Sequence, residues 1–73
     1  MSEFERWMEE AAAEAIEDLS PSLARNSKGW LETGVAPARI MQMMRKTIMD
    51  SSVLDLLELA LEHWKGQENV EEN

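Results

Sequence analysis

Side chains that could carry out acid–base, nucleophilic or metal chemistry are few in this sequence. Its 73 residues include one histidine, His63, and no cysteine. A structural zinc site needs about four His or Cys ligands, so the sequence cannot supply one. Composition leaves open a triad of His63 with a Ser and an Asp. So short a chain, however, can hardly enclose a pocket that excludes water.

The sequence also lacks the short motifs that position phosphates, dinucleotides or catalytic zinc. It contains no glycine-rich dinucleotide motif, no phosphate-binding loop, no paired-histidine zinc motif and no nucleophile elbow. We expect His63 to lie in the last turn of a helix, where the helix dipole favours a basic group. We therefore expect a protein that is not an enzyme and that binds no cofactor and no metal ion.

The charged residues are unevenly distributed along the chain, whose formal net charge is −8. Residues 1–19 hold seven acidic residues and one basic residue, and residues 50–73 hold the same numbers. Residues 20–49 hold five basic residues and one acidic residue. The acidic residues of the first segment either form a solvated face, pair inside the fold with the basic helix predicted from Pro37, or engage a basic groove on a nucleic-acid enzyme.

The basic segment is predicted to contain a helix from Pro37 to about Met49. The residues of this helix expected to face the core are Ile40, Met44, Thr47 and Ile48. The residues expected on its opposite side are Arg39, Gln42, Arg45 and Lys46. Met49 lies among these polar residues, and methionine is favoured on adaptable binding surfaces. This side of the helix is therefore the predicted contact surface.

Residues 30–40, WLETGVAPARI, resemble the turn of a helix-turn-helix DNA-binding motif, and the likeness covers about residues 26–45. The matching positions are Gly34 for the turn glycine, Val35 for the buried turn residue, and Ile40 and Met43 for later core residues. The sequence departs from the motif at Trp30, where a small residue is usual, and at Gly29, where an apolar residue is usual. The resemblance implies that the basic helix would enter the major groove of DNA.

The first helix is predicted from Glu3 to Leu19, because Ser2 and Glu5 form a capping box at its start. Its apolar stripe comprises Phe4, Trp7, Met8, Ala11, Ala15 and Leu19. The spacing of three and four residues predicts that this stripe, Trp7 included, faces the core. Ser20-Pro21 should end this helix and begin a short second one. The second helix is expected to be weak around residues 26–29 and to end at Gly34.

The last helix is predicted from Val53 to Lys65, with Gly66 as its stop. Leu57 lies at the centre of its apolar face, and the face is wide. Leu54 and Leu61 extend it on one flank, and Leu56 and Leu59 extend it on the other. Either the other helices surround this helix completely, or one flank docks a partner or a second copy of the chain. Residues 67–73 are mostly polar and acidic and are predicted to be disordered.

The sequence thus predicts an all-α fold, a small bundle of three main helices plus a short second helix. A single domain is expected over residues 1–66, followed by a disordered acidic C-terminal tail at residues 67–73. The first residues lack the apolar run of a signal peptide, and no stretch is long and apolar enough to span a membrane. We therefore expect a soluble, cytoplasmic protein that does not bind membranes.

The favoured hypothesis is a small acidic regulatory or inhibitory protein that docks on a larger protein partner. Phage-encoded or bacterial accessory factors that act on transcription or another nucleic-acid machine work in this manner. The predicted partner-binding residues are Arg39, Gln42, Arg45, Lys46, Met49, Leu54 and Leu61. The main alternative is a helix-turn-helix-like, DNA-binding transcriptional regulator. A structural subunit that forms a homodimer through the last helix is the third.

Overall fold

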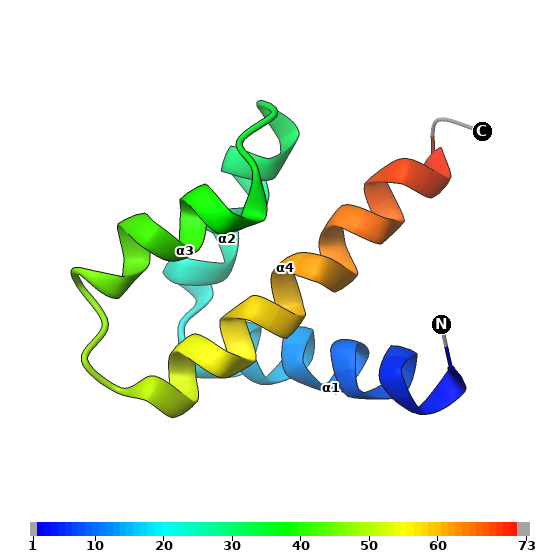
Figure 1. Cartoon of the computed structure of the whole chain (residues 1–73), viewed down its shortest axis with the longest axis horizontal. Helices are drawn as coiled ribbons and strands as arrows, with labels where there is room; N and C mark the ends of the chain where they lie inside the picture. Colours follow the sequence, from blue (N-terminus) through cyan, green and yellow to red (C-terminus); the bar gives the residue numbers. More distant parts are fainter. Residues whose placement is uncertain (1, 72–73) are drawn as a thin grey trace.

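The computed structural model describes the backbone of residues 2–71 and the side chains of residues 2–67. Within this part the chain forms four helices and no strand. The helices are α1 (Glu3–Leu19), α2 (Pro21–Glu32), α3 (Pro37–Arg45) and α4 (Ser51–Glu71) (Figure 1). The prediction of an all-α bundle is confirmed, although the shortest helix is α3, with nine residues, and not α2.

Hydrogen bonds between neighbouring residues fix the start of the first two helices, as the sequence predicts. The Ser2 hydroxyl accepts from the backbone N–H of Glu5, at 3.2 Å between Oγ and N. The Ser20 hydroxyl accepts from the N–H of Leu23, also at 3.2 Å, and Pro21 follows in the first turn of α2. Each hydroxyl satisfies an N–H group that has no partner within its helix.

The second helix is more regular than predicted. It runs without interruption from Pro21 to Glu32, and the expected weakness around residues 26–29 is absent. Ala24, Ser27 and Leu31 are buried on one side of this helix. Packing of that side outweighs the low helix propensity of Gly29, which costs only about 1 kcal/mol relative to alanine.

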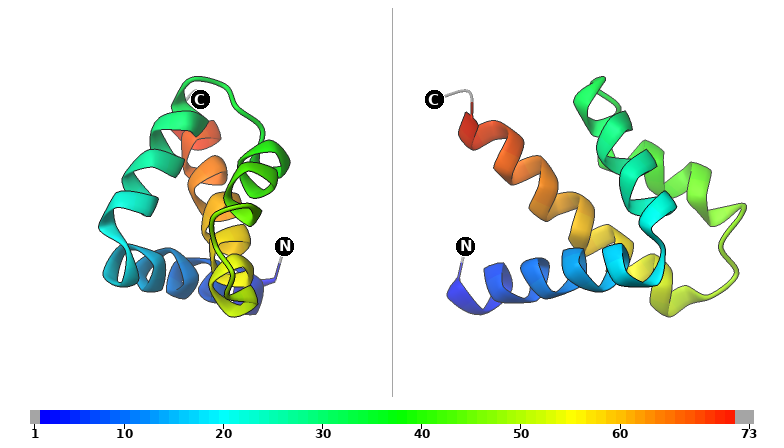
Figure 2. Two further views of the ribbon diagram at one scale, coloured as in Figure 1. Left: turned by 90° about the vertical axis from the view of Figure 1, so that its left-hand side faces the viewer. Right: turned by 180° about the vertical axis from the view of Figure 1, so that it is seen from behind.

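A tight turn reverses the chain between α2 and α3 (Figure 2). Gly34 has φ +94°, and no other residue of the described chain has positive φ. The N–H of Val35 then donates to the carbonyl of Trp30 at 2.9 Å, which closes the end of α2. Glycine suits this position because other residues rarely adopt the left-handed conformation.

Two predicted helix ends are wrong. The third helix ends at Arg45 rather than Met49, because the N–H groups of Thr47 and Ile48 both bond to the carbonyl of Met44 and form a turn. The fourth helix continues past Gly66 to Glu71, since a single glycine weakens a helix without breaking its hydrogen bonds. Residues 67–73 are predicted to be disordered. Their side chains lie outside the described part from residue 68 onward, and their backbone lies outside it from residue 72 onward.

Helix α4 is the central element and contacts each of the other three helices. Leu57 and Leu61 of α4 are fully buried, as are Ile16 of α1 and Ile40 of α3. Ala60 is also fully buried and Trp64 nearly so, which extends the core along α4. The prediction that the other helices surround α4 is therefore confirmed for the centre of its apolar face.

The buried side of α1 is not the predicted one. The side chains of Phe4, Trp7 and Leu19 are 65 %, 63 % and 64 % exposed, whereas Ala12, Ala13 and Ile16 are buried. The apolar arc of α1 is wider than its contact with α4, and small alanines let the two helices approach closely. The prediction that Trp7 is a core residue is wrong, and the same prediction for Leu57 is confirmed.

No helix in residues 2–71 is long and apolar enough to cross a membrane.

Candidate functional site

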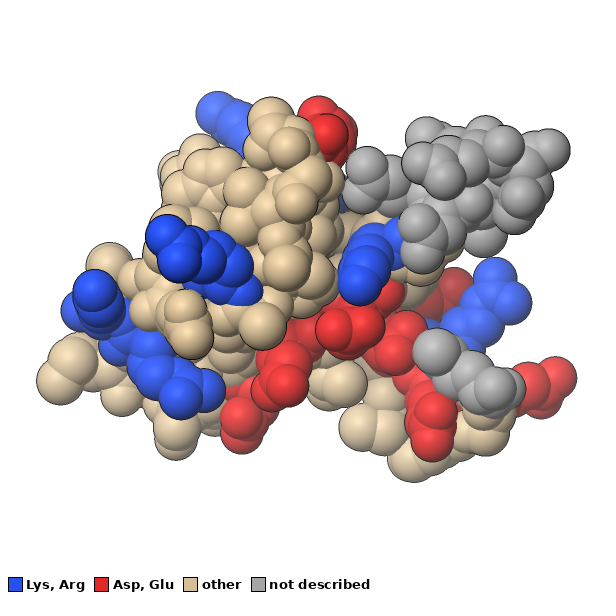
Figure 3. Space-filling model, turned by 45° about the horizontal axis from the view of Figure 1, so that its top comes forward, with Lys and Arg blue, Asp and Glu red and all other residues tan. Residues whose placement is uncertain are grey.

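The outward side of α3 brings together four polar residues that the sequence singled out. Arg39, Gln42, Arg45 and Lys46 are all exposed, and we call them the basic face. With Met43 and Thr47 they line a shallow groove of about 680 Å³. Figure 3 shows basic side chains over α3 and, beyond them, a band of acidic side chains that crosses the molecule. The basic face therefore presents three cations around a partly apolar floor.

The core holds the basic face in this orientation. Ile40, Met41 and Met44 are buried on the opposite side of α3 and join the core around α4. Pro37 starts the helix, where its missing N–H costs no hydrogen bond. Because charged groups are costly to bury, the same packing directs Arg39, Arg45 and Lys46 into solvent.

The cations of the basic face have no ionic partner within the described chain. The one ion pair among the described side chains joins Lys28 of α2 to Glu17 of α1. Helices α1 and α3 do not contact each other. The hypothesis that the acidic first helix pairs with the basic helix inside the fold is therefore wrong. Arg39, Arg45 and Lys46 are therefore exposed to solvent without an ion pair among the described side chains.

The apolar residues predicted to join this surface divide into three cases. Met49, in the segment between α3 and α4, is 93 % exposed. Leu54, in the first turn of α4, is half-buried and packs against the core. Leu61 is fully buried, so the prediction that it contacts a partner is wrong. About two helical turns of α4 separate the half-buried Leu54 from Leu61, which the bundle encloses.

The sequence interpretation missed a surface on α1. The rings of Phe4 and Trp7 stack with their centroids 6.3 Å apart and an angle of 26° between their planes. Ala11, one turn further along, is exposed as well. We call Phe4, Trp7 and Ala11 the aromatic stripe. Three exposed acidic residues, Glu3, Glu10 and Glu14, flank this stripe, because each lies three or four residues from Trp7 or Ala11. We call them the acidic row.

The width of the apolar arc of α1 was the signal for this surface. At about 100° per residue, Trp7 and Ile16 lie on opposite parts of the helix surface, and Leu19 and Ala12 lie between them. A bundle of this size cannot bury both parts. The sequence shows the excess apolar surface, but the choice between the two parts depends on which one packs against α4.

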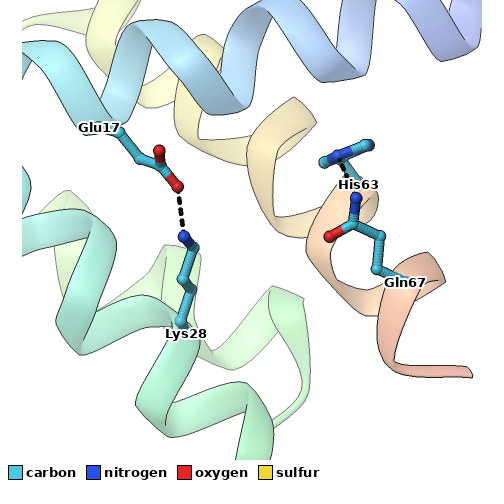
Figure 4. Close-up of polar contacts among 4 residues, drawn as sticks. All are labelled: Glu17, Lys28, His63 and Gln67. Atoms are coloured by element: carbon cyan, nitrogen blue, oxygen red, sulfur yellow. Dashed lines mark hydrogen bonds and ion pairs between the residues drawn. The ribbon is translucent and has the colours of Figure 1, made fainter. Parts of the chain in front are cut away.

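A second groove, of about 560 Å³, lies between α1, α2 and α4 and is lined by Glu10, Glu14, Glu17 and Glu32 among others. Lys28 lines this groove and pairs with Glu17 (Figure 4). The ammonium of Lys28 also lies 5.0 Å from the ring centroid of Trp64. His63 also lines this groove, and its Nε2 is 2.9 Å from Nε2 of Gln67. An amide nitrogen only donates, so His63 accepts this hydrogen bond.

Among the described residues, His63 is not part of a candidate metal site. Among residues 2–67, no three or more His, Cys, Asp or Glu side chains are arranged to hold a metal ion. The hydrogen-bond partner of His63 is Gln67, which is neither a nucleophile nor a carboxylate.

The helix-turn-helix resemblance can be compared with the geometry of α2 and α3. Gly34 forms the left-handed turn, Ile40 is buried, and Val35 and Met43 are half-buried. Trp30, where the motif has a small residue, is half-buried and packs against the core. The two helices and the turn are thus present, with a large side chain between them where the motif has a small one.

Comparison of the chain with protein-family models, with curated proteins and with solved structures gives no match.

Proposed function

We propose that this chain is a non-enzymatic regulatory or inhibitory protein that docks on a larger protein through the basic face of α3. The single observation that supports this most is the set of exposed cations that have no ionic partner among the described side chains. Arg39, Arg45 and Lys46 surround a groove, and the groove floor includes Met43. Met49, three residues after Lys46 in the chain, is 93 % exposed and would add an apolar contact. A partner surface that carries carboxylates around an apolar centre would match both features.

An acidic protein surface suits this face better than a nucleic acid does. The whole chain carries a formal charge of −8, so a nucleic acid would be repelled by most of the molecule. Specific DNA-binding proteins commonly make about six to ten phosphate contacts. The basic face offers three cations, whereas a protein carboxylate cluster needs only two or three. The geometry therefore favours a protein partner.

A helix-turn-helix DNA-binding regulator is the second candidate, and the α2–α3 turn supports it. Gly34 provides the left-handed turn, and Arg39, Gln42 and Arg45 project from the helix that would enter the major groove. In that case each lost cation should reduce the salt slope of DNA binding by about one unit. A fluorescence-polarisation titration with genomic duplex fragments at physiological salt measures this. We expect no sub-micromolar binding.

Affinity purification tests the proposal when it compares matched variants. The bait is the tagged chain in a lysate of its own organism, before and after nuclease treatment. Arg45→Glu/Lys46→Glu should lose the captured protein, because two of the three cations of the groove are reversed. Arg25→Glu/Lys65→Glu changes two exposed cations elsewhere and alters the net charge equally, so it should retain the protein.

Three results would contradict the proposal. Capture that both double variants retain would place the contact outside the basic face. Capture that both variants lose would indicate that only total charge matters. Loss of the captured material after nuclease treatment would favour the DNA-binding alternative.

A further inference from the structure

We propose that two copies of this chain associate head to tail, with the aromatic stripe and acidic row of α1 in one copy docked on the basic face of α3 in the other. This association does not require the larger partner of the proposed function, but both contacts use the basic face, so a second copy and the larger partner would compete for it. A second copy is the occupant we assign to the basic face, because the structure contains both surfaces of that contact.

The aromatic stripe is an apolar surface that the fold leaves uncovered. Phe4 and Trp7 are 65 % and 63 % exposed, and their rings stack on each other rather than on the core. Aromatic side chains give large apolar contact areas and are enriched in protein interfaces. The basic face offers a matching floor, because Met43 lines its groove and methionine adapts to the shape of an aromatic ring.

The charges around the two surfaces are complementary. Glu3, Glu10 and Glu14 form the acidic row beside the stripe, and none of them has an ion pair within the described side chains. Arg39, Arg45 and Lys46 surround the groove and are equally unpaired. Ion pairs between the acidic row and the basic face would give the charges of both surfaces a partner. They would also fix the register of the contact.

The same copy cannot make this contact with itself. Helices α1 and α3 pack on α4 without touching each other. The N-terminal half of α1 and the helix α3 lie toward opposite ends of the molecule in both Figure 1 and the rear view of Figure 2. The acidic row can therefore reach a basic face only on a second copy.

A symmetric contact between two α1 helices fits the charges less well. Two antiparallel α1 helices packed stripe to stripe would place one acidic row along the other, and like charges at close range repel. The net charge of −8 on each copy also opposes any association at long range. At physiological salt the Debye length is about 8 Å, so the opposite charges at the α1–α3 contact outweigh the distant ones.

The association is expected to be weak, because each surface is a few residues wide. Stable interfaces bury about 1,200–2,000 Å² in total, and one helix face on a shallow groove covers less than that. Sedimentation velocity should therefore show the average mass rising between about 10 µM and 1 mM protein. Added salt at about 0.5 M should reduce the association, because it screens the ion pairs.

Mixing two disabled variants tests the head-to-tail geometry. Phe4→Ala/Trp7→Ala removes the stripe and leaves the basic face. Arg45→Glu/Lys46→Glu reverses the basic face and leaves the stripe. Each variant alone should stay monomeric, and the equimolar mixture should associate, because each copy supplies the surface that the other lacks. Arg25→Glu/Lys65→Glu has the same net charge as the second variant and should associate like the parent chain.

A charge-reversed pair keeps the test decisive if removing two aromatic residues disturbs the fold. Glu10→Lys/Glu14→Lys should be monomeric alone and should associate when mixed with Arg45→Glu/Lys46→Glu. Circular dichroism verifies that every variant is folded.

Several outcomes would overturn the inference. A parent chain that stays monomeric up to about 1 mM at low salt would contradict it, as would mixtures that fail to associate while the parent chain does. Association of Arg45→Glu/Lys46→Glu alone would instead indicate a symmetric α1–α1 contact. None of these experiments involves the larger partner, so their failure is distinguishable from failure of the proposed function.

Discussion

Lys28 holds its ammonium group 5.0 Å from the ring centroid of Trp64, and the same ammonium pairs with Glu17. One side chain of α2 thereby connects α1 and α4 across the groove that these helices line. The side chain of Lys28 is 42 % exposed, so solvent screens its ion pair and keeps the contribution small. The contact over Trp64 adds to it, because a cation over an indole ring is attracted by the negative face of the ring.

Replacing Lys28 with Ala should lower the free energy of unfolding by about 1 kcal/mol, the combined scale of an exposed ion pair and a cation–π contact. Urea denaturation followed by circular dichroism measures this difference. Lys65→Ala is the matched control, because Lys65 is exposed on α4 and makes neither kind of contact with the side chains of residues 2–67. Equal stability of the two variants would show that Lys28 does not connect the helices in solution.

Trp7→Ala and Leu57→Ala should differ sharply in stability. The Leu57 side chain is fully buried, so its truncation leaves a cavity and should cost about 2–5 kcal/mol. Trp7 is 63 % exposed, and its replacement should change stability by about 0.5 kcal/mol or less. Thermal melting of both variants at low protein concentration measures this contrast. A comparable loss for Trp7→Ala would place that ring in the core after all.

Ser27→Ala should stabilise the protein. Ser27 is fully buried on α2, and its hydroxyl has no hydrogen-bond partner among the described residues. An unsatisfied buried hydroxyl costs about 1–3 kcal/mol, and alanine fits the same space without that cost. Ser22→Ala on the exposed side of α2 controls for the higher helix propensity of alanine. The Ser27 variant should melt above this control, and an equal or lower melting temperature would contradict the argument.

Asp50→Ala should weaken the start of α4 in a manner that depends on pH. The Ser52 hydroxyl and the backbone N–H of Ser52 both donate to the Asp50 carboxylate, and these hydrogen bonds lower its pKa. A lowered pKa in the folded state means that the carboxylate stabilises the fold above its ordinary pKa of about 4. This stabilisation is lost as the pH falls through the folded-state value.

Melting temperatures measured from pH 7 down to about pH 2.5 test this prediction. The difference between the parent chain and Asp50→Ala should be constant near neutral pH and should shrink below about pH 4. Asp50→Asn is the control, because its amide oxygen still accepts from Ser52 but cannot titrate. A difference between the parent chain and Asp50→Ala that persists unchanged into acid would exclude the carboxylate as its source.

The sequence alone determined the features of this protein that depend on neighbouring residues. Ser2, Ser20 and Gly34 act within three or four residues of their own position, through a hydroxyl cap or a left-handed turn. The exposure of the basic face was also predictable, because Arg39, Arg45 and Lys46 are too costly to bury without partners. These outcomes do not depend on how the helices are arranged.

The tertiary structure alone decided which apolar residues are covered. Phe4 and Trp7 are as suited to a core as Ile16, which lies on the other side of α1, yet Ile16 is buried and the two aromatic residues are exposed. Leu54 and Leu61 belong to one flank of α4 in sequence, but the first is half-buried and the second is enclosed. A periodic pattern does not distinguish one apolar residue from another. Close packing between particular helices buries some of them and leaves others exposed.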